Sequence, residues 1–148
     1  MKAQARPILA SSCARAATAE EARFRIDRPI GGRAALVIAL DDEAADVVDR
    51  VAEKPWQGAR FLHADDASTA ELDEADLAIM VATADADGNV AEAIARACAE
   101  RGIMTAGLIL GERLDVAAAV SALRPYARNL MVTEDEEDIA AVLTALRA

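Results

Sequence analysis

Side chains that could bind or repel a charged ligand follow three apolar runs of this sequence. In chain order they are Asp41, Asp42, Asp65, Thr83, Asp85, Gly88 and Asn89. Carboxylates, a hydroxyl and a glycine are the groups that metal and nucleotide sites use. Because they follow strand-like runs, we expect them along one edge of a sheet, where open α/β folds bind their ligands.

The loop after the first apolar run opposes phosphate binding. A nucleotide site would need glycine there, so that the backbone approaches the phosphates and a helix N-terminus offers free N–H groups. The sequence instead reads Asp41-Asp42-Glu43-Ala44. At about 4 Å and an effective dielectric constant near 20, each like-charge contact costs about 4 kcal/mol before screening. We therefore expect no direct phosphate binding in this loop unless a cation intervenes.

The loop after the third apolar run keeps one glycine, Gly88, and one hydroxyl, Thr83. Asp85 and Asp87 again oppose an anion. Short polar side chains before a helix favour N-capping, so Asp87 or Asn89 is expected to cap the helix that follows.

The carboxylates could alternatively hold a metal ion, because Mg²⁺ favours a few oxygen ligands plus water. The candidates are Asp41, Asp42, Asp65, Asp66, Asp85 and Asp87. The stretch from Asp85 to Asn89 is not a calcium loop, since its twelfth position is Arg96 where glutamate is needed. We expect no cofactor and no resident metal, with Mg²⁺ at this edge as the alternative.

Groups that commonly act as nucleophiles or bases form no recognisable set. His63 is the single histidine; one histidine without a recognisable Ser or Cys nucleophile to pair with makes no triad, and we expect a hydrogen-bonded structural residue. Cys98 falls on the apolar side of a helix and is expected in the core. Trp56 is expected to close the end of the first helix, or else to anchor a partner. These residues favour a protein that is not an enzyme.

Apolar runs alternate with helically spaced stretches from Arg33 onward. The pattern predicts strands at 34–40, 60–63, 77–82, 104–110 and 130–132, and helices at 43–53, 89–101, 115–123 and 135–147. The continuous runs at 34–40 and 77–82 are typical of strands buried on both faces. Strands alternating with helices predict an α/β fold: a three-layer, doubly wound, Rossmann-like parallel sheet of about five strands.

Charge divides the 148 residues into a basic N-terminal arm, 1–33, expected to be partly ordered, and an α/β domain, 34–148. The arm carries seven basic and three acidic side chains, the domain nine and 23. Such an acidic domain should repel nucleic acid, whereas the arm could reach an acidic partner. The arm could also form a short helix at 18–25 or an edge strand at 23–26. No apolar run approaches 18 residues and the arm lacks a signal-peptide pattern, so we expect no membrane association and a cytoplasmic protein.

Several segments resemble the nucleotide-binding domain of the FtsZ/tubulin family. They are 46–51, 58–65, 74–82, 91–96, 100–109 and 123–132. The resemblance implies a Rossmann-like GTPase framework. The family's glycine-rich first loop corresponds to Asp41-Asp42-Glu43-Ala44, and its Gly-Gly-Gly-Thr-Gly-Thr-Gly phosphate loop to 82–89, with only Gly88 left. No GTP-binding or catalytic residue carries over, so the fold is expected without the GTPase and filament functions.

A second set of segments, 76–89 and 93–109, is similar to phosphosugar-binding domains of the sugar-isomerase type. Those domains bind phosphate with a Ser/Thr-rich loop, of which only Thr83 is left. Two hypotheses follow. The first is a small, non-catalytic accessory or interaction domain that has lost GTP binding and acts through a protein partner or as a homo-oligomer. The alternative is a Mg²⁺-dependent domain that binds a small ligand or nucleotide at the aspartate-lined edge.

Overall fold

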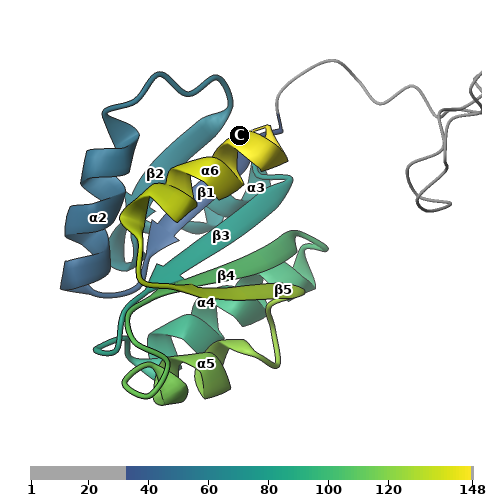
Figure 1. Ribbon diagram of the computed structural model, residues 1–148. Helices are drawn as coiled ribbons and strands as arrows, with labels where there is room; N and C mark the ends of the chain where they lie inside the picture. Colours follow the sequence, from purple (N-terminus) through teal and green to yellow (C-terminus); the bar gives the residue numbers. More distant parts are fainter. Residues whose placement is uncertain (1–32, 148) are drawn as a thin grey trace, which may run out of the picture. The chain divides into compact units, whose positions relative to one another are not determined.

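The computed structural model describes residues 33–147 (Figure 1). The strands are β1 (Ala35–Ala39), β2 (Ala59–His63), β3 (Leu77–Ala82), β4 (Met104–Leu110) and β5 (Asn129–Thr133). The helices are α2 (Asp42–Ala52), η2 (Ala64–Asp66), α3 (Thr69–Asp73), α4 (Gly88–Glu100), α5 (Ala117–Leu123) and α6 (Glu136–Leu146). The predicted basic arm, its helix or edge strand, and Cys13 lie outside the described residues, except for Arg33.

The five strands form one parallel sheet in the order β2-β1-β3-β4-β5. The chain steps outward from β1 to β2, then crosses back over β1 to β3 and continues to β5. Strand order therefore reverses between β1 and β3, whose carboxyl ends form the switch point where doubly wound folds bind ligands. The predicted three-layer, doubly wound α/β fold is confirmed.

Side chains alternate between two apolar layers on opposite faces of the sheet. Val37 and Ile79 pack with α2 and α6 on one face. Leu36 and Met80 pack with α3, α4 and α5 on the other. Figure 1 shows α6 beside α2 on the first face. Every residue of β1 and β3 is buried, as the continuous apolar runs predict.

The connection from β2 to β3 is where the sequence-based expectation is wrong. No element is expected between residues 63 and 77, yet η2 and α3 lie there. Ser68 caps α3 by accepting a hydrogen bond from the Glu71 N–H, at 3.4 Å. Leu72 alone among the α3 residues is buried. One apolar residue gives no periodicity, although a parallel crossover needs a covering element.

Helix ends follow the predicted signals closely. Gly102 has φ +68° and ends α4. Its N–H donates to the Ala99 carbonyl oxygen at 3.1 Å, and the Ile103 N–H donates to that of Cys98 at 3.0 Å. This pair of bonds is a Schellman motif, which uses glycine because the left-handed conformation strains other residues.

Candidate functional site

Asp41 begins the first helix at the switch point. Its backbone is extended (φ −147°, ψ 168°), and α2 starts at the next residue. Its Oδ1 accepts a hydrogen bond from the Ala44 N–H at 2.8 Å. This is N-capping: a short carboxylate satisfies an N–H that would otherwise lack an acceptor in the first helical turn.

The same carboxylate crosses to the loop after β3. Asp41 Oδ2 accepts from the Thr83 N–H at 2.8 Å, and Oδ1 accepts from the Thr83 hydroxyl at 2.9 Å. Thr83 is only 2% exposed. Its hydroxyl oxygen accepts in turn from the Asp85 N–H at 3.4 Å. Both oxygens of Asp41 thus bind donors from the two loops that diverge at the switch point.

These donors resemble those of an anion-binding site, with the Asp41 carboxylate in the place of the anion. In nucleotide sites of this fold class, free backbone N–H groups at a helix N-terminus hold a phosphate. Here the Ala44 and Thr83 N–H groups already donate to Asp41. A phosphate would have to displace a negatively charged group that is covalently part of the loop.

The other predicted site residues do not join this network through their side chains. Asp42 lies exposed in the first turn of α2, and Asp65 lies exposed in η2. Asp85 contributes its backbone N–H, while its side chain is exposed. Among residues 33–147, no three His, Cys, Asp or Glu side chains are grouped as a metal ion would require. The aspartates therefore follow the strands without forming a cluster.

Gly88 and Asn89 open α4. Of the two predicted caps, Asp87 and Asn89, the structure has Asp87, whose Oδ1 accepts from the Asn89 N–H at 2.8 Å. A Cβ added at Gly88 would lie 3.3 Å from the Cβ of Ala122 in α5. Glycine at this position thus lets two neighbouring helices approach closely, which gives it a packing role.

The remaining chemically capable residues are held in structural contacts. His63 Nε2 lies 3.2 Å from Asp49 Oδ1, and both side chains are exposed. Cys98 is fully buried, and burial raises the pKa of its thiol. The Trp56 indole N–H donates to the Val51 carbonyl oxygen at 2.8 Å, which confirms that it closes the end of α2.

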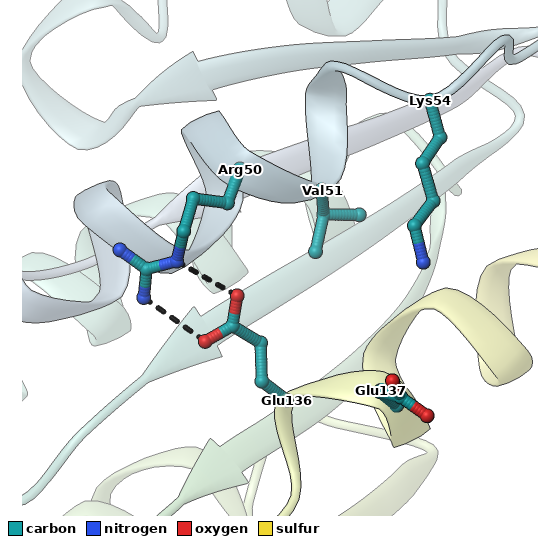
Figure 2. Close-up of a pocket in the computed structure, with 5 residues that line it drawn as sticks. All are labelled: Arg50, Val51, Lys54, Glu136 and Glu137. Atoms are coloured by element: carbon teal, nitrogen blue, oxygen red, sulfur yellow. Dashed lines mark hydrogen bonds and ion pairs between the residues drawn. The ribbon is translucent and has the colours of Figure 1, made fainter.

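A shallow groove between α2 and α6 was not predicted. Its volume is about 280 Å³, and it is lined by Arg50, Val51, Lys54, Glu136 and Glu137 (Figure 2). Arg50 donates to both carboxylate oxygens of Glu136, at 2.8 and 2.9 Å. The hydrogen bond from Arg50 lowers the pKa of Glu136. The acidic start of the last helix was visible in the sequence, but its position beside α2 was not, because that depends on strand order.

No Ser, Thr, Cys or His side chain lines this groove, and its arginine is already paired. Lys54 extends toward α6 in Figure 2, where Glu137 also lies. With opposite charges facing each other across it, the groove lacks the excess of one charge that would attract an ionic ligand. The Arg50–Glu136 contact in this groove joins α2 to α6, although the two residues lie 86 positions apart in the chain.

Comparison with known proteins finds similarity among solved structures but not among family models. No family model matches the sequence, and no curated protein matches it significantly. A solved structure described as a flavodoxin from the domain Archaea is similar at 11% sequence identity and a TM-score of 0.47. The similarity covers 76% of this chain and 92% of that one. In the part of the chain that the structure describes, no helix is both long and apolar enough to cross a bilayer.

Proposed function

We propose that this protein is a non-catalytic, Rossmann-like accessory or interaction domain that binds no GTP at its switch point. The observation that carries the proposal is the Asp41 carboxylate, which accepts from Ala44 N–H, Thr83 N–H and the Thr83 hydroxyl. Backbone N–H groups at a helix N-terminus and in the neighbouring loop are the kind of donor that phosphate sites use. With them engaged, the framework keeps its fold without its usual ligand.

The excess of acidic side chains in the described residues favours a partner other than nucleic acid. Residues 33–147 contain ten Arg and Lys against 23 Asp and Glu side chains. A phosphate backbone would be repelled by such a surface. The proposed partners are therefore a protein or a second copy of the chain, in the cytoplasm. The similarity to the FtsZ/tubulin domain stays a prediction.

Calorimetric titration tests the proposal directly. GTP, GDP and inorganic phosphate are titrated into the full chain, with and without Mg²⁺. We expect no binding in any arm. Micromolar binding without Mg²⁺ would overturn the internal-anion argument, while binding that requires Mg²⁺ would favour the metal-dependent alternative instead.

A matched pair of variants sharpens the titration. Asp41→Asn removes the charge that holds the loop donors, and Asp42→Asn removes the same charge from an exposed neighbour. If electrostatics at the donors alone excludes phosphate, only Asp41→Asn should gain measurable phosphate affinity. Equal gains in both variants would mean that overall charge, and not the Asp41 contacts, excludes the anion.

A further inference from the structure

In the part of the chain that the structure describes, the outer edge of β5 lacks the charges, the proline and the further strand that usually keep sheet edges from pairing. Within the described residues, β5 is hydrogen-bonded to β4 alone and forms one end of the sheet. Its sequence, Asn129-Leu130-Met131-Val132-Thr133, contains no charge and no proline. Leu130, Met131 and Val132 are half-buried. Edge strands without lysine, proline or a covering element tend to add a further strand.

The opposite edge of the sheet is protected. β2 carries Arg60 at its second position. The Arg60 guanidinium lies 2.5 Å from Glu71 and 3.2 Å from Glu74, and it also donates to the Glu71 carbonyl oxygen. A charged side chain in the strand, tied to the α3 segment, disfavours edge-to-edge pairing at β2. Any added strand therefore belongs at β5.

The residues that flank β5 are self-complementary. Arg128 precedes the strand and Glu134 follows it; both are exposed, and neither makes an ion pair with another residue in 33–147. They lie six positions apart along an extended segment, roughly 20 Å, too far to reach each other within one chain. In an antiparallel pair of two such strands, each Arg128 would stand opposite the other copy's Glu134.

We propose that β5 pairs with β5 of a second copy of this chain, antiparallel, about a two-fold axis at Met131. This inference deepens the proposed function by naming the partner. Leu130 then stands opposite Val132, Asn129 opposite Thr133, and Met131 opposite itself. The contact is isologous, as in most homodimers, and converts two five-stranded sheets into one continuous sheet.

Backbone geometry fits this register. The Thr133 carbonyl oxygen accepts from the Gly111 N–H of the chain leaving β4, at 2.9 Å. By alternation, the N–H and C=O groups of Leu130 and Val132 point away from β4. Around an axis at Met131, these two residues form hydrogen-bonded pairs. Met131 and its counterpart then form a non-hydrogen-bonded pair, in which side chains approach most closely.

Side-chain faces agree as well. Leu130 and Val132 belong to the apolar layer that contains α5, whereas Met131 belongs to the layer that contains α6. Opposed residues in an antiparallel pair share one face of the sheet. Each layer of one copy would therefore continue into the same layer of the other, and would cover side chains that are half-buried in the single chain.

Charge variants of the full chain test the proposal by sedimentation equilibrium. We expect a concentration-dependent dimer. Arg128→Glu and Glu134→Arg should each weaken dimerisation on the order of tenfold, because each puts like charges together at both ends of the pair. An equimolar mixture of the two variants should recover the wild-type dimer, since opposite charges then meet at both ends. Lys54→Glu and Glu43→Arg, exposed sites in or just after α2, which packs on β1, β2 and β3, serve as matched controls.

Two results would overturn the pairing: a monomer at all concentrations, or charge variants that dimerise like their controls and show no recovery on mixing. Neither result bears on nucleotide binding, which is measured separately, so the two proposals fail independently.

An engineered disulfide between two copies tests the proposed register of the β5 pair. In a Cys13→Ser background, Met131→Cys should form an intermolecular disulfide under mild oxidation, because the two thiols would face each other across the axis. Leu114→Cys is the control, since Leu114 is 90% exposed but lies in the loop after β4. Linkage at Leu114→Cys without linkage at Met131→Cys would contradict the proposed axis.

Discussion

Two carboxylates of this domain each link α2 or its cap to a distant segment of the chain, and their partners differ in burial. Asp41 binds donors of Ala44 and Thr83, and Thr83 is 2% exposed. Glu136 binds Arg50, and these side chains are 38% and 55% exposed. Asp41 itself is partly exposed, but it accepts from a buried residue, whereas both partners of the Arg50–Glu136 contact are accessible to water.

The difference teaches where a carboxylate contributes most to this fold. Two of the three Asp41 donors are backbone N–H groups that the chain already holds in place, so ordering them costs little entropy. The Arg50–Glu136 pair must immobilise two long, solvated side chains, and salt screens their attraction. The switch point is consequently a stabilising junction, while the α2–α6 groove is a weaker surface link.

Removing the Asp41 carboxylate should have the largest effect. Asp41→Ala deletes an N-cap and leaves the buried Thr83 N–H and hydroxyl without their acceptor, which should cost about 3 kcal/mol of unfolding free energy. Urea denaturation measures this loss. Asp42→Ala, an exposed neighbour, should change the unfolding free energy by no more than about 0.5 kcal/mol. Similar losses in both variants would show that the Asp41 contacts contribute no more stability than an exposed neighbouring carboxylate.

Thr83→Val should have the next largest effect. It keeps the shape of the side chain but removes the hydroxyl that donates to Asp41 and accepts from the Asp85 N–H, costing about 1–2 kcal/mol. Thr83→Ser, which keeps the hydroxyl, should lose less. A double-mutant cycle with Asp41→Ala should show strongly non-additive losses, because both changes break the same contact. Additive losses would argue against the Asp41–Thr83 contact.

Glu136→Gln should have the smallest effect, and that effect should depend on pH and salt. Arg50 lowers the pKa of Glu136 below its ordinary value of 4.5. A lowered folded-state pKa stabilises the fold above the unfolded-state pKa, and this stability is lost as pH falls through the folded-state value. The wild type should therefore exceed Glu136→Gln in thermal midpoint at neutral pH, and the two should converge at acidic pH and in high salt. A midpoint difference that persists at pH 2 would rule out the ion pair as its cause.

Most of the fold could be predicted from sequence because its strongest signals are local. The buried apolar runs of β1 and β3 and the glycine after α4 can each be recognised from a stretch of a few residues. The short helix α3 could not be predicted, since its single buried residue, Leu72, gives no period. The groove at Arg50 and Glu136 was also missed, because the contact joins residues 86 positions apart.

The sequence by itself determined the alternation of strands and helices, the helix caps, and the presence of carboxylates where related folds keep glycine. Each of these follows from the residue types within one turn or one strand. Only the tertiary structure decided that both oxygens of one of those carboxylates, Asp41, accept hydrogen bonds, from Ala44 of its own helix and from Thr83. That outcome required β1 to lie next to β3, and strand order is set by the packing of the whole sheet, which no local pattern encodes.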